Sequence, residues 1–225
     1  MFSRRLVMDA VKRDGRILGG LADEHRRDRE LVVEAVRSEP CAIRYAAEEL
    51  RSDRSLVLLS VQRFGLALQW ASDDLRADRN VVLEALRQDG CALEYAAPEL
   101  KADRDMVMKA LQNNGTLEHA AVELRSDRAV VLEAVMQDGL DLEHADETLK
   151  SDREVVLFAV QDTGFALEFA TEELRSDRLI VLAAVKQHGA AALKFASMKL
   201  QAADLEVMRW AALHRRWRHE QSVAT

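Results

Sequence analysis

The stretch SDREVVLFAVQDTGFALEFATEEL, residues 151–174, holds the pattern that decides the fold. Asp152 suits a helix N-cap, because its carboxylate accepts hydrogen bonds from the free backbone N–H groups of the first turn. Apolar residues then follow at the spacing of one helical face: Val155, Val156, Ala159 and Val160. We expect Gly164 to end this helix in the left-handed conformation that helix C-termini favour. A second apolar stripe runs from Ala166 to Leu174, so the stretch predicts two short antiparallel helices of about eleven and nine residues.

The same pattern recurs through the chain at a nearly constant period. Asp-Arg pairs begin at Asp28, Asp53, Asp78, Asp103, Asp127, Asp152 and Asp177, in steps of 25, 25, 25, 24, 25 and 25 residues. Isolated helices shorter than ~12–15 residues are marginal in water, so each helix pair must cover its apolar face with the next pair. A fixed period of this size is typical of solenoids. The sequence therefore predicts an all-α solenoid of about eight two-helix repeats.

The two ends of the repeat array are expected to differ from its middle. We expect a single helical-repeat domain over residues 1–213, with a degenerate first repeat at 1–27, a C-terminal capping repeat at 203–213 and a basic, then polar, tail at 214–225. In the first repeat, Gly19 and Gly20 interrupt the apolar stripe and His25 takes a leucine position. Weak apolar content is typical of a terminal repeat, which must expose one face.

Each Asp-Arg pair also predicts a contact between repeats. The arginine occupies the same place in every repeat, one stacking step from the acidic residues of the next repeat. We therefore expect a ladder of ion pairs along the array, each contributing ~0–1 kcal/mol if exposed.

The repeat consensus is D-R-x-V-V-L-x-A-V-x-x-D-G-x-A-L-x-Y/F-A-x-x-x-L. It resembles the domain of unknown function 4116 family, and the resemblance extends from Leu6 to about Leu200, nearly the whole chain. It is specific because many positions recur together in each repeat. The resemblance implies a helical repeat module and brings no established activity with it.

Composition and motifs argue against several classes of function. The chain of 225 residues has 32 basic and 39 acidic residues, a formal net charge of −7, which disfavours nonspecific nucleic-acid binding by the whole surface. Cys41 and Cys91 form no CxxC pair, which disfavours a disulfide scaffold or a zinc site. The sequence contains no HExxH, GxSxG or phosphate-cradling glycine loop. We therefore expect a chain that is not an enzyme and that holds no cofactor or metal.

Positions that depart from the consensus are candidate partner-binding residues. Leu59 and Phe158 stand six residues after the aspartate, where most repeats carry a polar residue. Leu179 takes another polar helix position, and Phe64 replaces the polar residue before the glycine. Large apolar side chains at exposed positions can form a binding patch, although isolated ones are common on protein surfaces. The leading hypothesis is a protein–protein interaction or scaffold module, or an accessory subunit of a larger complex, with these four residues as anchors.

Basic residues at both ends support an alternative hypothesis. Residues 1–29 carry a net charge of +3 and residues 186–225 a net charge of +4. The C-terminal run with Arg215, Arg216 and Trp217 is a candidate docking segment for an acidic surface, RNA or an anionic membrane. It can also be the solvated end of a capping helix. Nucleic-acid or membrane-surface binding through the basic ends therefore stays open, as does an enzyme with an unrecognised site.

The sequence says little about location. No apolar run approaches the ~18 residues that a membrane span requires, so we expect no transmembrane segment. A soluble intracellular protein is the favoured interpretation. The amphipathic, arginine-rich start MFSRRLVMDAVKR, residues 1–13, leaves organellar targeting open.

Overall fold

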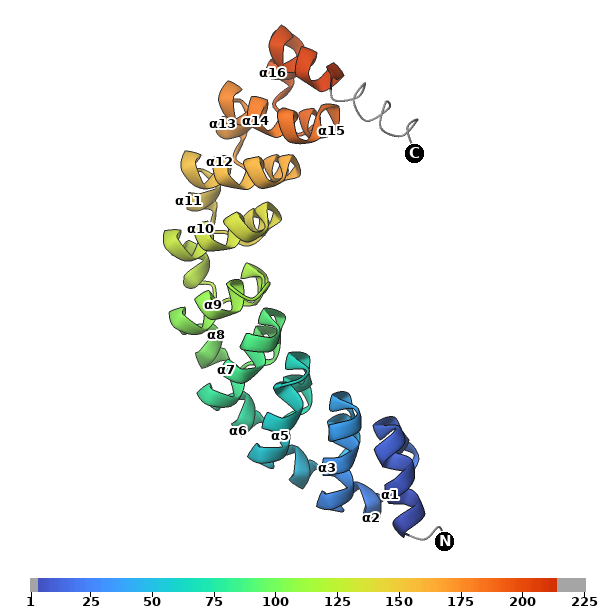
Figure 1. Cartoon of the computed structure of the whole chain (residues 1–225). Coiled ribbons are helices and arrows are strands. Elements are labelled where there is room, and N and C mark those ends of the chain that lie inside the picture. Colours follow the sequence, from blue (N-terminus) through green and yellow to red (C-terminus); the bar gives the residue numbers. More distant parts are fainter. Residues whose placement is uncertain (1–3, 214–225) are drawn as a thin grey trace. The chain divides into compact units, whose positions relative to one another are not determined.

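The computed structural model describes residues 4–213, apart from the side chains of Lys199, Ala202 and Ala203. The described residues fall into two compact units, one ending at His119 and the other beginning at Ala120, here called unit 1 and unit 2. Within each unit, helical repeats stack on one another in chain order (Figure 1). The predicted all-α solenoid class is thereby confirmed for each unit.

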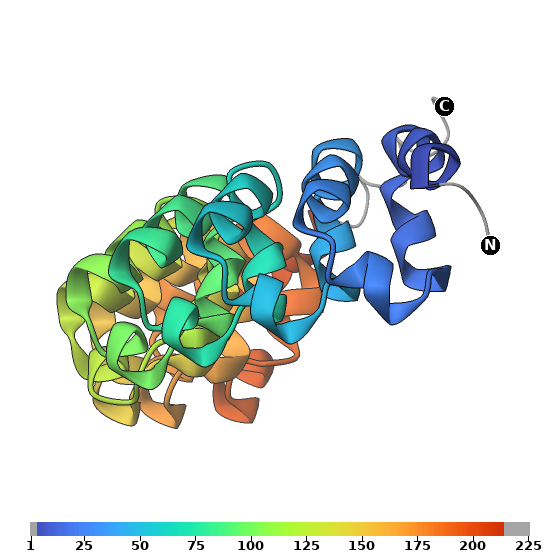
Figure 2. The same ribbon diagram turned by 90° about the horizontal axis from the view of Figure 1, so that it is seen from below.

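Unit 1 consists of two layers, seen from below in Figure 2. One layer holds the long helices α1 (Arg4–Arg13), α3 (Arg29–Ser38), α5 (Arg54–Val61), α7 (Arg79–Gln88) and α9 (Arg104–Leu111). The other holds the 3₁₀ helices η1 (Gly15–Gly20), η2 (Pro40–Tyr45), η3 (Gly65–Trp70), η4 (Gly90–Tyr95) and η5 (Leu117–His119). Short α-helices follow the 3₁₀ helices: α2 (Asp23–Arg26), α4 (Glu48–Arg51), α6 (Asp73–Arg76) and α8 (Pro98–Lys101).

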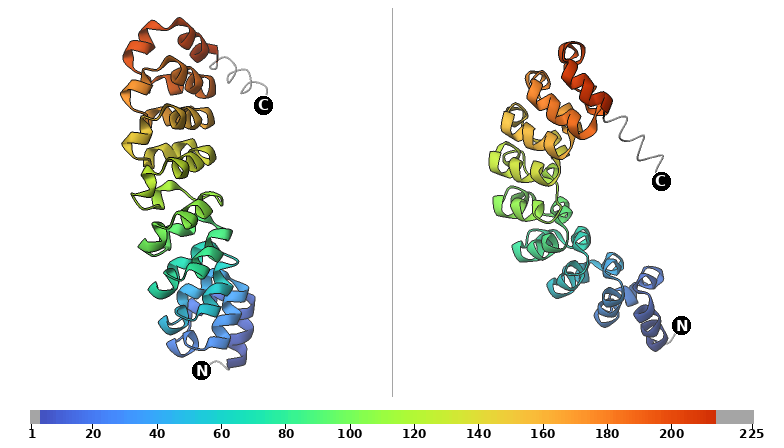
Figure 3. Two further views of the ribbon diagram at one scale, coloured as in Figure 1. Left: turned by 90° about the vertical axis from the view of Figure 1, so that its left-hand side faces the viewer. Right: turned by 45° about the horizontal axis from the view of Figure 1, so that its top comes forward.

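Unit 2 repeats this plan, and its long helices lie side by side in chain order (Figure 3, left view, yellow to red). They are α10 (Arg128–Gln137), α12 (Arg153–Asp162), α14 (Arg178–His188) and a helix over 205–213. The 3₁₀ helices are η6 (Leu124–Ser126), η7 (Gly139–His144) and η8 (Gly164–Phe169). The short α-helices are α11 (Glu147–Lys150), α13 (Glu172–Arg175), α15 (Ala190–Leu193) and α16 (Met198–Ala203).

Each complete repeat pairs a long helix with a second helical arm, as predicted, and this second arm is divided into two short segments. The second apolar stripe forms the six-residue 3₁₀ helix η8 and the four-residue α13, separated by a sharp turn. Ala170 and Thr171 in this turn are extended, with ψ of 154° and 156°. The backbone N–H of Thr171 donates to the carbonyl of Lys150 in the preceding repeat, at 3.2 Å. This hydrogen bond between repeats replaces the one that would have continued the helix.

Gly164 does not end α12 as a left-handed C-cap, and that prediction is wrong. Thr163, before Gly164, is extended, and among the described glycines only Gly189 has a positive φ, 57°. Gly164 is needed because a Cβ there would overlap the backbone carbonyl of Ala184 in the next repeat. Gly15, Gly65, Gly90 and Gly139 face the equivalent alanine carbonyl in the same way. The glycine therefore allows consecutive repeats to approach closely.

The second repeat shows how a different residue is accommodated at this position. Pro40 replaces the glycine, and its carbonyl accepts a hydrogen bond from the buried Ser60 hydroxyl at 2.7 Å, where the other repeats have alanine. Arg63 donates to the carbonyls of Val36 and Arg37, at 3.1 and 2.5 Å. Side-chain hydrogen bonds thus stabilise the joint between these two repeats.

The predicted Asp-Arg ladder is confirmed within both units. In unit 1, Arg29 contacts Asp53 at 2.6 Å and Arg54 contacts Asp78 at 2.8 Å. The other ladder pairs that join consecutive repeats are Arg4–Asp28, Arg79–Asp103, Arg128–Asp152, Arg153–Asp177 and Arg178–Asp204. Asp78 also caps its own helix, because it accepts from the N–H groups of Asn80 and Val81. Each aspartate therefore joins a helix start to the previous repeat.

A second ladder, made of backbone atoms, connects the short helices. In unit 1, Ser72 N–H donates to the carbonyl of Arg51 at 3.1 Å, and Ala97 N–H donates to the carbonyl of Arg76 at 2.9 Å. The same bond joins Ala47 to Arg26, Asp146 to Arg125, Thr171 to Lys150 and Ser197 to Arg175. Together with the arginine ladder, it fixes the orientation of each repeat on its neighbour.

The core of each unit lies between the two layers. In α7, Val81, Val82, Ala85 and Leu86 are completely buried, as the helical periodicity predicts. The equivalent residues of α3, α5, α9, α10, α12 and α14 are buried in the same way, and the 3₁₀ helices add residues such as Ala92 and Leu93. In the first and last long helices, Leu6 and Met208 at these positions are exposed. This arrangement leaves the opposite face of the long helices exposed to solvent.

Candidate functional site on the long helices

The exposed face of the long helices in unit 1 carries a row of apolar side chains. Each long helix has three consecutive apolar residues, such as Leu56, Val57 and Leu58 in α5. The first two are buried in α3, α5, α7 and α9, whereas in α1 Leu6 is 60% exposed. The third is turned by the helical rotation to the edge of the core and is half-buried in all five helices. The residues at this third position are Met8, Val33, Leu58, Leu83 and Met108, which we call the apolar row.

Two hollows open between neighbouring helices along the apolar row. The hollow between α1 and α3 has a volume of about 320 Å³ and is lined by Met8 and Val33. The hollow between α5 and α7 has a volume of about 270 Å³ and is lined by Leu58 and Leu83. The polar residues that complete the linings are Lys12, Arg29, Glu30, Glu34 and Arg37 in the first hollow, and Arg54, Gln62, Asn80, Glu84 and Arg87 in the second. Equivalent positions of two separate pairs of repeats therefore form equivalent hollows.

Ion pairs hold the polar walls of these hollows in place. Arg37 donates to Glu34 at 2.7 Å, and Arg87 pairs with Glu84 one turn earlier in the same way. Arg54 is fixed by the ladder to Asp78, and this guanidinium holds the pKa of Asp78 below its usual range. The hollows thus have apolar residues beside charged groups that ion pairs hold in position.

Charge is divided between the two layers of unit 1. The long-helix segments with their caps (residues 4–13, 28–38, 53–63, 78–88 and 103–113) contain 12 basic and 9 acidic residues, a net charge of +3. The remaining residues of 4–119 contain 7 basic and 12 acidic residues, a net charge of −5. The whole positive excess lies in residues 4–13, and the other four long-helix segments together are neutral.

The two candidate anchor residues of unit 1, Leu59 and Phe64, lie in different layers of the structure. Leu59 is half-buried on α5, at the position that Glu34 and Glu84 occupy in the hollows, so it adjoins the apolar row. Phe64 precedes η3 in the other layer and is half-buried, and its ring centroid lies 6.3 Å from that of Trp70. Leu59 thus belongs to the long-helix face, whereas Phe64 packs locally.

The nominated residues of unit 2 lie on the neighbouring helices α12 and α14. Phe158 is 37% exposed and takes the position equivalent to Glu84, while Leu179 is 58% exposed and takes the position equivalent to Asn80. Leu179 lacks the side-chain oxygen of the equivalent Ser55, which accepts a hydrogen bond from Arg29 at 2.7 Å. Three nominated residues, Arg215, Arg216 and Trp217, lie outside the described residues.

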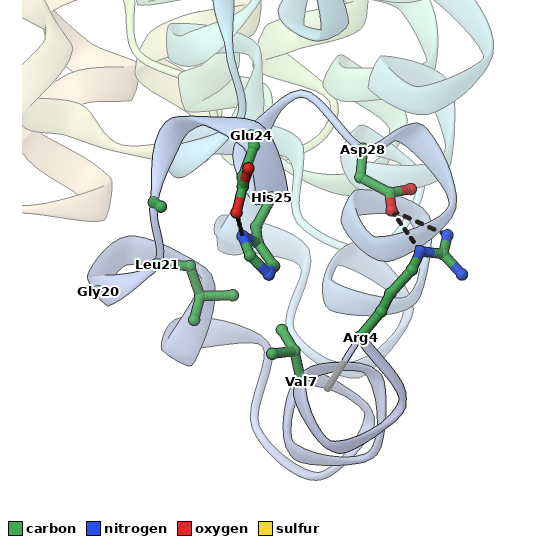
Figure 4. A pocket seen from close by; sticks show the side chains of 8 residues that line it. Arg4, Val7, Gly20, Leu21, Glu24, His25 and Asp28 are labelled. Carbon is green, nitrogen blue, oxygen red and sulfur yellow. Dashed lines mark hydrogen bonds and ion pairs between the residues drawn. The ribbon is translucent and has the colours of Figure 1, made fainter. Parts of the chain in front are cut away.

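A larger hollow of about 560 Å³ lies in the first repeat (Figure 4). It opens where Gly20 stands in place of the aromatic residue and His25 in place of the leucine of later repeats. Arg4 pairs with Asp28 at 2.8 Å, and His25 Nδ1 lies 3.6 Å from a carboxylate oxygen of Glu24, beyond hydrogen-bond distance. The other lining residues are Val7, Leu21 and Ala22. The hollow is therefore a mostly apolar gap at a terminal repeat.

Two features are absent from residues 4–213, the part of the chain that the structure describes. Over this range, no three histidine, cysteine, aspartate or glutamate residues come together in a way that suits a metal ion. In the same range, none of the helices combines the length and the apolar character that crossing a bilayer requires.

Comparison with known proteins identifies the repeat. A family model described as "Domain of unknown function (DUF4116)" matches the chain at residues 3–51, 53–101, 103–150 and 152–201. Each match spans two of the structural repeats, so the family pattern coincides with pairs of stacked repeats. No curated protein and no solved structure matches the chain. Because the four matches cover most of the sequence, the chain belongs to the domain of unknown function 4116 family.

Proposed function

We propose that the chain is a non-catalytic protein-interaction module whose binding surface is the long-helix face of unit 1. The apolar row carries this proposal, because half-buried methionine, valine and leucine side chains recur at one position of successive helices without being needed to fill the core. Contiguous exposed apolar surface rimmed by polar groups is typical of protein-binding sites.

The composition of the hollows favours a protein over a nucleic acid as the partner. Glu30, Glu34 and Glu84 lie in the walls, and carboxylates repel the phosphates of a nucleic-acid backbone. An apolar lining contributes to affinity by removing apolar surface of the partner from water. The role is therefore that of a scaffold or accessory subunit that holds another polypeptide.

Replacing Leu58 by arginine is expected to reduce partner capture at least tenfold, because it puts a charge in the middle of the apolar row. The fold should be retained, since Arg209 occupies the equivalent position in the last repeat. The measurement is quantitative mass spectrometry of proteins that the immobilised chain retains from a native extract, compared between the parent chain and Leu58→Arg.

Leu66→Arg is the matched control for this experiment. Leu66 is also a half-buried leucine of the same repeat but lies on η3 in the other layer, and the equivalent first-repeat residue is Arg16. We expect this variant to retain the same proteins as the parent chain. Equal losses in the two variants, or no loss in Leu58→Arg, would be incompatible with the proposed surface.

Phe158→Ser tests whether the equivalent face of unit 2 contributes. Phe158 is 37% exposed, so the change should leave the far-UV circular dichroism and the melting temperature nearly unchanged while weakening partner capture. A large drop in the melting temperature would show that Phe158 is a core residue and not an anchor.

A further inference from the structure

We propose that the long-helix face of unit 2 binds a partner protein segment in which a carboxylate lies beside large apolar side chains. The surface consists of exposed apolar residues on neighbouring long helices together with the cations Arg153 and Lys186, and we call it the unit 2 patch. The inference goes beyond the proposed function, because it concerns a different unit and holds whether or not the apolar row of unit 1 binds a partner.

Exposed apolar side chains gather on the long helices of unit 2, which lie side by side (Figure 3, left view). Five large ones are each at least 37% exposed: Met136, Phe158, Leu179, Trp210 and Leu213. In the hollow between α5 and α7 of unit 1, polar residues hold the equivalent positions: Asn80, Glu84 and Arg87. Apolar residues at these positions of α10, α12, α14 and the helix over 205–213 therefore extend across neighbouring helices, as in a binding patch.

Arg153 keeps free hydrogen-bond donors within this patch. Its Nε pairs with Asp177 at 3.1 Å, and its side chain is half exposed. Other ladder arginines also contact the residue two positions after the aspartate, in the pairs Arg4–Glu30, Arg29–Ser55, Arg79–Asp105, Arg128–Glu154 and Arg178–Glu206. Leu179 holds that position opposite Arg153, so within residues 4–213 this guanidinium has no second acceptor. Its outer nitrogens can donate to a carboxylate of a partner.

Lys186 lacks the carboxylate that its counterparts in unit 1 have. Arg37 and Arg87 at the equivalent position each pair with the glutamate three residues earlier. Ala183 takes the place of that glutamate, and no carboxylate of the described residues pairs with Lys186. The exposed Lys186 Nζ instead lies 5.4 Å from the centroid of the Trp210 ring. A second cation with unused capacity thus lies beside an exposed aromatic residue.

This combination selects the chemistry of the partner. The apolar residues favour side chains that lose water on binding, and the two cations favour a carboxylate. The nearby Glu154 and Glu206 do not neutralise these cations, because they pair with Arg128 and Arg178. A nucleic acid gains its affinity from many phosphate contacts, and two cations among apolar residues supply few. A protein segment that is both acidic and apolar therefore fits the patch best.

The double variant Leu179→Glu/Ala183→Glu tests the inference by restoring residues that other repeats carry. Glu154 is equivalent to position 179, and Glu84 is equivalent to position 183. Each new glutamate gains a cation as partner, so we expect a melting temperature at or above that of the parent chain. Peptides are selected from a displayed library of random 16-residue sequences on the full parent chain, and the double variant removes those that bind elsewhere. We expect the enriched peptides to combine acidic with large apolar residues.

A labelled synthetic copy of an enriched peptide measures the effect by fluorescence anisotropy. We expect the double variant to raise its Kd at least tenfold. Val122→Glu/Leu140→Glu is the matched control, because it adds the same charge at two exposed apolar residues of unit 2 outside the long helices, and it should leave the Kd unchanged. Lys186→Met copies Met136 at the equivalent position and should raise the Kd at least threefold, because it removes one cation.

Four results would overturn the inference: no peptide that distinguishes the parent chain from the double variant, enriched peptides without acidic residues, an unchanged Kd in Lys186→Met, or equal weakening in the double variant and its control. Binding of phosphatidylserine vesicles or poly(U) RNA by the parent chain but not by the double variant would also overturn it, because the patch would then be a membrane or nucleic-acid site. The proposed function fails separately, when Leu58→Arg in unit 1 leaves capture of proteins from extract unchanged.

Discussion

Gly90→Ala is expected to destabilise unit 1 by about 3 kcal/mol, at the upper end for an added methyl group in a packed interior. A Cβ at this position would lie 2.5 Å from the backbone nitrogen of Gly115 and 2.8 Å from the carbonyl oxygen of Asn113, and would overlap the carbonyl of Ala110. All of these are backbone atoms, so no side chain can rotate away. The next repeat must shift, which also strains the hydrogen bond from Gly90 N–H to Asn113, 2.8 Å long.

Gly20→Ala is the matched control, because a Cβ at Gly20 meets no atom within 4 Å. We expect it to change the free energy of unfolding by less than about 0.5 kcal/mol, as is usual for surface substitutions. Urea unfolding followed by circular dichroism measures both variants. Similar stabilities for Gly90→Ala and Gly20→Ala would show that close approach of the repeats does not require the glycine.

Acid is expected to lower the melting temperature by about 10 °C between pH 5 and pH 2.5, as the aspartates of the ladder become protonated. Hydrogen bonds from the ladder arginines hold the pKa of Asp53, Asp78 and Asp152 below the usual range. Because these folded-state pKa values lie below the unfolded value of about 3.9, the contribution to stability is fully present above that pH. It is lost as the pH falls through the lower, folded-state pKa values.

Replacing these three aspartates by asparagine separates charge from capping. Asparagine caps helices about as well as aspartate, since its side-chain oxygen accepts the same backbone N–H groups. The triple variant should be less stable than the parent chain at pH 7 and should show a smaller difference in melting temperature between pH 5 and pH 2.5. An acid-induced decrease as large as that of the parent chain would assign the effect to other carboxylates.

The repeat, the long helices and the ladder could be predicted because each depends on residues close in sequence or at a fixed period. Asp78 predicts its cap from the local sequence, and the 25-residue period places Arg54 opposite it. The break between η8 and α13 could not be predicted in this way. It depends on the hydrogen bond from Thr171 to Lys150, which exists only when two repeats are stacked.

The candidate site was only partly visible in the sequence. Leu59 was selected because it departs from the consensus, whereas Leu58 beside it matches the consensus and was not selected. The third of three consecutive apolar residues, after Leu56 and Val57, was the available signal, because a helix cannot turn all three toward the same neighbour. Whether this third residue is covered depends on the separation of adjacent helices, which the sequence does not state.

The arginine ladder gives each unit a direction. Asp53 forms an ion pair with Arg29 of the preceding repeat. Its carboxylate also accepts a hydrogen bond from the backbone N–H of Ser55 in its own helix. If one repeat unfolds, the next repeat toward the C-terminus loses the arginine that pairs with its capping aspartate. The previous repeat keeps its capped aspartate, and only its arginine loses an ion-pair partner. Unfolding in such a nearest-neighbour array should therefore spread more readily toward the C-terminus than toward the N-terminus.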